Sequence, residues 1–375
     1  MSWDIKDVLS NFILKITHYL FIGHRMKENL IGVALGAMIL CAGCGQTEEQ
    51  PLIPSNEREC IVVGDIKDLK TGTVDLQDEF DDYHVIASGR SRKGEFVIRT
   101  EVSQPTYVYA YLGDKQLRDF FLEPGVITIS GEDWEKDYSK GAVGSPSNDY
   151  WQLFDKERIQ TDKDGLDSLF LRYYNNAPTD IVRLKLIGFR PTPWASQRKV
   201  ELFKELDPDV FSMPGVNSML DLYTRRAKTE PDNIYVNIEQ PGPDGVVKSL
   251  KDVVEKPGNK YVLLDFWATW CGPCREQIPI VKKAYEQYHD KGLDIYACSL
   301  DNGNALMKQW RQYIVDNELP WTNVCDGEST RSKAYQDYAM QGIPDNVLID
   351  CSDGRIIARS LESEDLMAKF SELLD

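Results

Sequence analysis

The sequence predicts an α/β domain at the C-terminus, preceded by a small antiparallel β domain and a helical connector. The C-terminal prediction rests on continuous apolar runs that alternate with segments of helical spacing over residues 233–375. Residues 59–135 instead hold short runs of alternating polarity separated by turn residues, and in residues 146–230 the apolar side chains recur at helical spacing. A chain of 375 residues that is 42% hydrophobic is long enough for separate cores.

The charge and the histidine content exclude two classes of function. The formal net charge of −17 argues against nucleic-acid binding, because each phosphate contact would have to overcome like-charge repulsion. The histidines are too scattered for local spacing to assemble a histidine-rich metal site: His18, His24, His84 and His289. We therefore expect neither a nucleic-acid partner nor a metal ion.

The N-terminal segment has the layout of an export signal. A lysine precedes an apolar stretch, residues 30–40, which is shorter than the ~20 residues needed to span a bilayer. The segment resembles a bacterial lipoprotein signal, which implies cleavage before Cys44 and lipid attachment to its thiol, although Cys41 stands where such signals usually have leucine. Residues 26–43 are therefore predicted to be the signal peptide, with an uncleaved anchor helix as the alternative. We expect residues 1–25 to be a mis-assigned upstream start.

Residues 44–58 are polar and contain prolines, so we expect a flexible tether between the membrane and the β domain. Within that domain, "TYVYAYL" places Tyr107, Tyr109 and Tyr111 on one face of a strand, because side chains alternate along a strand. We expect this aromatic face to pack on a core, and a platform for a ligand is the alternative.

The helical connector, residues 146–230, contains no cysteine and only ordinary charged faces. The segment "RPTPW", residues 190–194, is expected to break it, because proline ends helices. We expect the connector to pack on one or both of its neighbours.

The C-terminal region begins with a predicted central strand. Residues 261–268, "YVLLDFWA", are apolar except for Asp265, which is typical of a parallel strand buried on both faces. The next segment has helical spacing through Ile278 and Val281 and ends at Gly292, so Cys271 lies where the strand passes into its helix. The later elements are predicted as strands over 293–301, 321–326 and 354–360 and helices over 304–317 and 363–374, and residues 332–350 are expected to lead into one more strand. Together they make a sheet with helices on both faces and an antiparallel hairpin at one edge.

The position of the two cysteines predicts redox chemistry. At a helix N-terminus, unpaired backbone N–H groups and the positive end of the dipole lower the pKa of a thiol, which makes Cys271 a nucleophile at neutral pH. Cys274 lies one turn further on, shielded by the helix and by Pro273, whose missing N–H costs nothing in a first turn. We therefore expect Cys271 to attack and Cys274 to resolve.

Other uses of a cysteine pair fit the sequence less well. A structural zinc site needs a second pair, whereas the other cysteines of this region stand alone: Cys298, Cys325 and Cys351. A disulfide across two residues closes too small a loop to stabilise the fold much, and haem attachment needs histidine where Arg275 stands. A second disulfide between Cys298 and Cys325 is conceivable, but free buried thiols are the more common arrangement.

These residues carry a resemblance. "DFWATWCGPC" together with the later "GIP" resembles thioredoxin, and more closely the exported, membrane-tethered proteins of the TlpA and ResA type, over residues 233–375. The β domain resembles the domain of unknown function that precedes the thioredoxin module in many lipid-anchored oxidoreductases of Gram-negative anaerobes. The resemblance implies a thioredoxin fold, a nucleophilic Cys271, a resolving Cys274 and a buried acid, Asp265, that accepts the proton of Cys274.

The same resemblance implies a substrate-binding surface around the cysteines, made by Trp270, Gly272, Pro273 and the cis-proline turn Ile343-Pro344. Asp345 departs from the pattern, because threonine is usual after the cis-proline. We expect its charge to lie close to the substrate groove.

Together these features predict a membrane-tethered thiol:disulfide oxidoreductase of the cell envelope, facing the periplasm or the outer-membrane surface. The Gly-Pro dipeptide between the cysteines is that of thioredoxin, whose potential is roughly −270 mV, so we expect a reductant or isomerase of exported proteins that contain disulfides. The expected electron donor is a transmembrane thiol reductase, and no cofactor is expected beyond the Cys271–Cys274 disulfide. The alternatives are a thiol peroxidase on the same fold and a non-catalytic binding lipoprotein.

Overall fold

The computed structural model describes residues 52–67, 69–131, 141–189, 192 and 194–375. The predictions for the start segment, the signal peptide and the lipidation of Cys44 lie outside these residues. Within them, no helix combines the length and the apolar character needed to cross a membrane.

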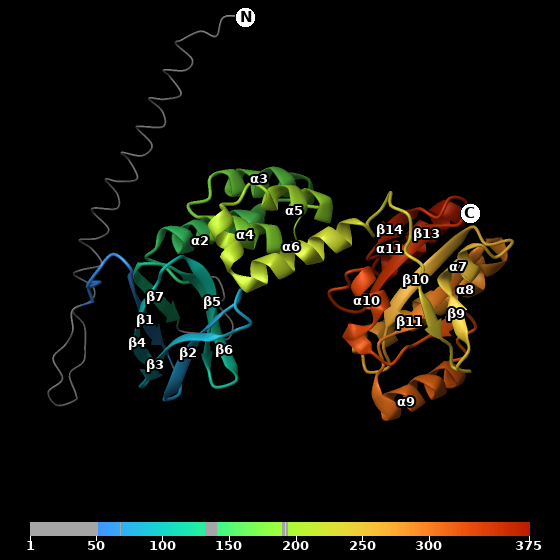
Figure 1. Cartoon of the computed structure of the whole chain (residues 1–375), viewed down its shortest axis with the longest axis horizontal. Helices are drawn as coiled ribbons and strands as arrows, with labels where there is room; N and C mark the ends of the chain where they lie inside the picture. The colour runs from blue at the N-terminus through green and yellow to red at the C-terminus, as the bar shows by residue number, and fades with distance from the viewer. Residues whose placement is uncertain (1–51, 68, 132–140, 190–191, 193) are drawn as a thin grey trace, which may run out of the picture.

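The β domain consists of two small sheets (Figure 1). One sheet has the strand order β4-β1-β7 and the other the order β3-β2-β5-β6. The bounds are β1 (Glu59–Ile66), β2 (Gly72–Asp78), β3 (Val85–Ser91), β4 (Glu95–Glu101), β5 (Thr106–Leu112), β6 (Lys115–Leu122) and β7 (Gly125–Gly131). The pairings are antiparallel, as predicted, except that β1 and β7 run parallel. β7 follows the last strand of the second sheet in the chain and returns to the first sheet beside β1.

The helical region packs on the β domain through an apolar core. Its helices are α2 (Pro146–Gln160), α3 (Leu166–Asn175), α4 (Asp180–Gly188), α5 (Ser196–Phe203) and α6 (Pro214–Ala227). Phe154 and Phe170 of the helices share one cluster with Tyr107 of β5 and Phe121 of β6. Tyr107 is 3% exposed, so this tyrosine of the aromatic face packs on a core, as expected.

The C-terminal domain is built on a five-stranded sheet of order β12-β11-β10-β13-β14. The strands are β10 (Tyr261–Trp267), β11 (Leu293–Ser299), β12 (Thr322–Val324), β13 (Asp345–Asp350) and β14 (Ile356–Arg359). β10 lies at the centre, parallel to β11 and antiparallel to β13, and all its residues after Tyr261 are buried. The predicted hairpin at the sheet edge is β13–β14.

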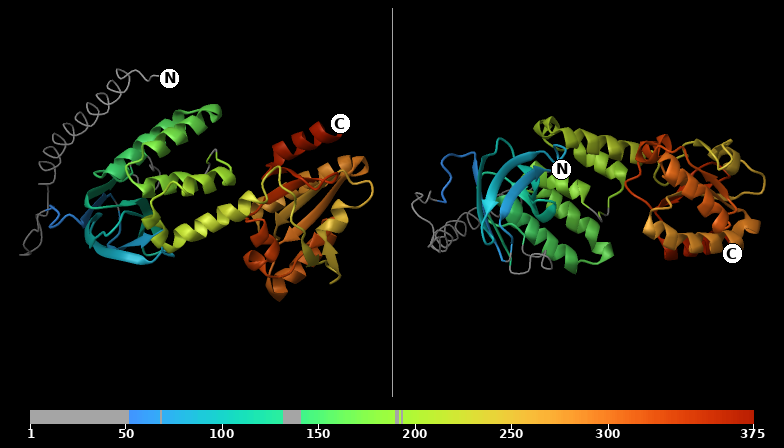
Figure 2. Two further views of the ribbon diagram at one scale, coloured as in Figure 1. Left: turned by 45° about the horizontal axis from the view of Figure 1, so that its top comes forward. Right: turned by 90° about the horizontal axis from the view of Figure 1, so that it is seen from below.

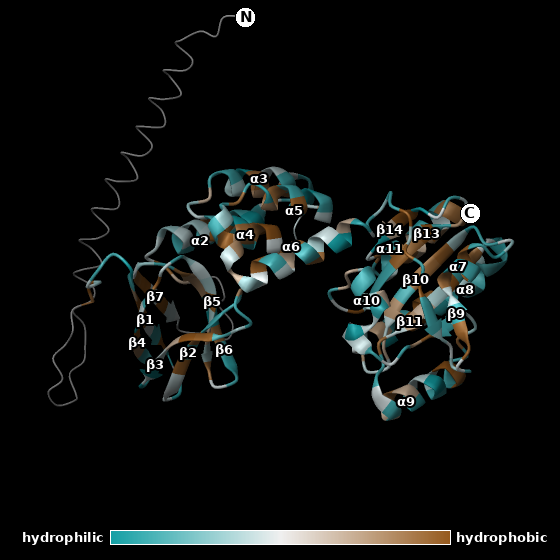
Figure 3. Ribbon diagram, viewed as in Figure 1, coloured by the Kyte–Doolittle hydropathy of each residue, from teal (hydrophilic) through white to brown (hydrophobic). Residues whose placement is uncertain are grey.

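Helices cover both faces of this sheet, which confirms the predicted α/β class (Figure 1). One apolar cluster joins β10 to α8 (Gly272–Tyr288), α9 (Gly303–Asp316) and α11 (Ser363–Leu374). The cluster on the opposite face includes α7 (Leu250–Val254) and α10 (Lys333–Asp337). Figure 3 shows hydrophobic colour along the central strands between these two layers. A short hairpin, β8 (Glu239–Pro241) and β9 (Val247–Ser249), precedes α7 and was not predicted.

Helix α6 extends from the helical region to the C-terminal domain (Figure 2). The contact at its C-terminal end is polar. Arg225 donates to the backbone oxygen of Gln336 over 2.8 Å, and Arg359 of β14 donates to the hydroxyl of Thr229 over 2.7 Å. The helical region therefore meets one neighbour through an apolar core and the other through hydrogen bonds and charges.

Candidate active site

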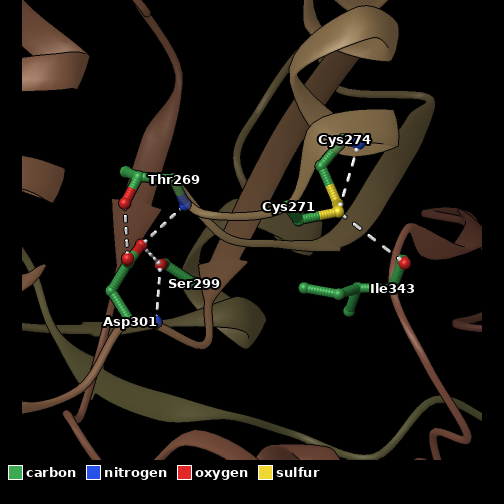
Figure 4. The surroundings of a disulfide bond; sticks show 6 residues. All are labelled: Thr269, Cys271, Cys274, Ser299, Asp301 and Ile343. Carbon is green, nitrogen blue, oxygen red and sulfur yellow. Dashed lines mark hydrogen bonds between the residues drawn. A yellow bond between two sulfur atoms is a disulfide. The ribbon is translucent and has the colours of Figure 1, made fainter.

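Cys271 and Cys274 form a disulfide at the start of α8. Cys271 is the N-cap residue of this helix, and its sulfur accepts the backbone N–H of Cys274 over 3.2 Å (Figure 4). The helix begins here because the buried strand β10 ends at Trp267 and Pro273 suits the first turn. In the reduced state, the same N–H groups and the helix dipole would stabilise a thiolate on Cys271.

The loop that contains the Ile343–Pro344 peptide lies against the disulfide. This peptide is cis, as the resemblance implies, and the Ile343 carbonyl oxygen lies 3.7 Å from the sulfur of Cys271 (Figure 4). Trp270 precedes the pair and is 51% exposed, and Pro273 and Pro344 are also exposed. Cys271 is 5% exposed and Cys274 is 1% exposed, so the expected client-binding residues lie beside the slightly more accessible cysteine.

Asp265 lies on β10, the strand that leads to the cysteines, and it is buried. Burial, with a further contribution from the negative charge of Asp345, raises the pKa of the Asp265 carboxyl to about 7. A carboxyl group with this pKa can both accept and release a proton near neutral pH, as a general acid or base requires.

A buried carboxylate that the sequence analysis missed holds the loop before the disulfide. Asp301 is fully buried and accepts three hydrogen bonds, from the backbone N–H and the hydroxyl of Thr269 and from the hydroxyl of Ser299 (Figure 4). The two bonds from hydroxyl groups are both 2.6 Å long. This network ties the loop after β10 to the end of β11, so it fixes the backbone from which Cys271 projects.

Asp345 lies close to the groove beside the cis-proline, as expected, but its charge is paired with cations of the protein. Its carboxylate is buried, accepts the Ser360 hydroxyl over 2.7 Å, and lies 3.7 Å from the guanidinium groups of Arg226 and Arg359. Arg359 comes from β14, whereas Arg226 comes from helix α6 of the helical region. The charge of Asp345 is therefore largely compensated inside the protein.

A groove of about 1350 Å³ lies between the cis-proline loop and the helical region. Its wall on the C-terminal domain includes Pro273, Gln277, Ile343 and Pro344, and its wall on the helical side includes Trp194, Lys199, Tyr223 and Arg226. The groove thus contains three of the expected client-binding residues, Pro273, Ile343 and Pro344, and its other wall comes from a part of the chain outside the C-terminal domain.

The remaining cysteines of the described residues are free thiols: Cys60, Cys298, Cys325 and Cys351. Cys298 and Cys325 do not pair with each other; Cys298 lies 3.2 Å from the side-chain oxygen of Gln240, and Cys325 lies 3.2 Å from the backbone oxygen of Asp301. Burial raises the pKa of Cys60 to about 12 and that of Cys325 to about 11, which leaves both poorly reactive. No group of at least three His, Cys, Asp or Glu side chains suited to hold a metal ion occurs within the described part of the chain.

Two family models match the chain. The Redoxin model matches residues 238–374, and the model of the Domain of unknown function (DUF4369) matches residues 60–151. These matches correspond to the C-terminal α/β domain and to the β domain with the start of α2.

Curated relatives match part of the chain. The thiol-disulfide oxidoreductase ResA of Bacillus cereus (strain ZK) is 30% identical over 133 residues, which are 35% of this chain and 67% of that protein. The thioredoxin-like protein YneN of Bacillus subtilis is 29% identical over 133 residues, 35% of this chain and 74% of that protein. The ResA of Oceanobacillus iheyensis is 33% identical over 86 residues, and there the chain spans only 45% of the relative's length.

Solved structures of thiol-disulfide oxidoreductases are also similar to part of this chain. A thiol-disulfide oxidoreductase from Bacteroides fragilis is 31% identical and covers 38% of this chain and 100% of its own, with a TM-score of 0.34. The thioredoxin domain of a thiol-disulfide oxidoreductase from Bacteroides vulgatus is 28% identical and covers 39% of this chain and 98% of its own, with a TM-score of 0.35.

Proposed function

Because the chain belongs to the ResA-type thiol-disulfide oxidoreductases through its C-terminal domain, we propose that it reduces or isomerises disulfides of exported proteins through Cys271 and Cys274. The single observation that carries the proposal is the asymmetry of this disulfide. Cys271 caps the helix beside the cis-proline loop, whereas Cys274 is turned into the domain. Such an arrangement gives one attacking and one resolving sulfur.

The reaction begins with the reduced pair. The Cys271 thiolate attacks one sulfur of a client disulfide, which forms a mixed disulfide and releases the other client sulfur as a thiolate. Cys274 then attacks the Cys271 sulfur, and its proton passes to the Asp265 carboxylate. The second client sulfur leaves, so two electrons have moved to the client and the Cys271–Cys274 disulfide has formed.

The groove supplies a site for the client. A cis-proline exposes backbone groups of its neighbour without a competing N–H, so an extended segment can bond to the backbone of Ile343. Trp270, Gly272 and Pro273 then contact the client around its cysteine. The groove has a volume of about 1350 Å³, so it can hold client residues next to that cysteine, which favours a peptide over a small disulfide.

The location and the electron donor are proposed from the N-terminal sequence. A lipid on Cys44 and the tether that follows would hold the protein at a membrane of the cell envelope, facing the periplasm or the outer-membrane surface. A transmembrane thiol reductase would return the disulfide to its dithiol form after each turnover, and no cofactor beyond the two cysteines takes part.

Trapping of the mixed disulfide tests this proposal. The Cys274→Ser variant lacks the resolving thiol, so it should accumulate covalent complexes with exported proteins that a reductant releases. The Cys271→Ser variant is the matched control, because it keeps one cysteine of the pair but lacks the nucleophile, and it should trap none. Equal trapping by both variants, or trapping by neither, would contradict the assignment.

A further inference from the structure

We propose that Arg226, which the helical region contributes, is a positioning residue of the redox site: by holding Asp345 next to the cis-proline, it sets the charge around Asp265 and the cysteine pair. The helical region would thereby change the redox potential of the Cys271–Cys274 pair, in addition to forming one wall of the groove. This inference rests on the proposed function.

The contacts of Arg226 concentrate on the segment around the cis-proline. Its guanidinium donates to the backbone oxygen of Ala339 over 3.2 Å and to the hydroxyl of Ser360 over 3.3 Å, and it lies 3.7 Å from the Asp345 carboxylate. The Ser360 hydroxyl in turn donates to Asp345 over 2.7 Å. One planar side chain therefore binds the loop before the cis-proline, the carboxylate after it and a residue at the end of β14.

The position of Asp345 makes this contact relevant to the chemistry. Asp345 directly follows Pro344, and its backbone pairs with Phe266, the neighbour of Asp265 on β10. The charge of Asp345 is also one of the two causes that raise the pKa of Asp265. A change in how far cations balance the negative charge of Asp345 should therefore change the pKa of Asp265.

The charged and titratable groups around these two carboxyls are few. Asp345 faces Arg226 from α6 and Arg359 from β14. Arg359 is also influenced by Glu230 and Tyr338, and burial lowers its pKa to about 10, so it remains a cation at neutral pH. Cys298 lies on β11, the strand next to β10, and the charge of Asp265 contributes to raising the pKa of its thiol. Among the residues that the structure describes, two cations pair with Asp345, and Arg226 is the one that comes from outside the redox domain.

The direction of the effect follows from charge. Without Arg226, the negative charge of Asp345 is less compensated, which favours the protonated forms of Asp265 and of the Cys271 thiol. A less stable thiolate makes the reduced form less stable, so the centre becomes a stronger reductant. The pKa of both groups should rise.

The test compares two adjacent arginines of the same interface in the full chain. Arg226→Gln removes the cation beside Asp345. The matched control is Arg225→Gln, because Arg225 bonds to the backbone oxygen and side chain of Gln336 but makes no ion pair with Asp345 in the described structure. Two quantities are measured: the equilibrium with glutathione, and the pH dependence of Cys271 alkylation by iodoacetamide.

In Arg226→Gln, we expect the equilibrium with glutathione to shift about threefold towards the disulfide, and the alkylation midpoint to rise by the corresponding half pH unit. Arg225→Gln should match the original protein in both measurements. Arg226→Lys should lie close to the original protein, because it restores the charge while losing the planar contacts. In the Asp345→Asn background, Arg226→Gln should have a smaller effect, since the charge on which it acts is gone.

Equal behaviour of Arg226→Gln and Arg225→Gln would overturn the inference, as would an Arg226→Lys variant that shifts as far as Arg226→Gln. These outcomes are distinct from failure of the proposed function, in which the original protein itself would show no equilibrium with glutathione.

Discussion

Asp265 is the residue whose environment most directly links stability to chemistry. Burial raises its folded-state pKa to about 7, whereas an unperturbed aspartate has a pKa of ~3.9. The neutral form is favoured by burial, so its contribution to stability is complete below pH ~4 and is lost as the pH rises through about 7. Above that pH the carboxylate is ionised in both states, but only in the folded state is its charge buried, which destabilises the folded state.

At the residue scale, we therefore predict that Asp265→Asn stabilises the oxidised protein at pH 8 and leaves its stability almost unchanged at pH 4. Asparagine has nearly the same shape but does not ionise. The gain at pH 8 is at most about 4 kcal/mol, from a shift of about three pKa units. Urea unfolding at the two pH values measures this gain, and an equal change in the free energy of unfolding at both pH values would rule out the raised pKa of Asp265.

The same Asp265→Asn variant should slow client release, because asparagine cannot accept the proton of Cys274.

Some of the helices and strands that surround the site could be predicted from the sequence, and others could not. The apolar run over residues 261–268 predicted β10, and its junction with the next helix placed Cys271 correctly, because both signals are local. The β8–β9 hairpin was missed because strands of three residues carry no periodicity. Asp301 and Arg226 were missed because their partners Thr269 and Asp345 lie far away in the chain, and local spacing cannot show such contacts.

At the element scale, we predict that Asp301→Ala detaches the loop of Thr269 from β11. The variant loses three hydrogen bonds to one buried carboxylate, so the free energy of unfolding should fall by roughly 3 kcal/mol. Asp290→Ala is the control: it removes an exposed acid and should change stability by less than about 0.5 kcal/mol. Chemical denaturation measures both, and equal effects would mean that the network does not hold the loop.

The whole molecule is negatively charged, and this charge affects which client segments approach the groove. The formal charge of the chain is −17, and the groove is lined by exposed carboxylates at its edge: Glu276, Glu362, Glu364 and Asp365. The cations of the helical wall are engaged within the protein, because Arg226 pairs with Asp345 and Lys199 lies 4.3 Å from the centre of the Tyr223 ring. A client segment that approaches the groove therefore meets a negative field.

At this scale, we predict that a peptide disulfide flanked by lysines is reduced faster than the same peptide flanked by glutamates, by about tenfold at low ionic strength. High salt should shrink the ratio, because it screens exposed charges. Comparing kcat/KM for the two peptides at two salt concentrations measures the effect. A ratio that salt leaves unchanged would show that the preference is not electrostatic.

The central claim is that Cys271 and Cys274 form a reducing redox centre, and its equilibrium potential tests that claim most directly. The titration uses the chain from Ser55 in defined glutathione or dithiothreitol buffers, with Cys271→Ser and Cys274→Ser as controls. We predict a potential near about −250 mV or lower that is lost in both variants. A potential above about −180 mV would make the centre an oxidant, and a protein that does not titrate would not be an oxidoreductase at all.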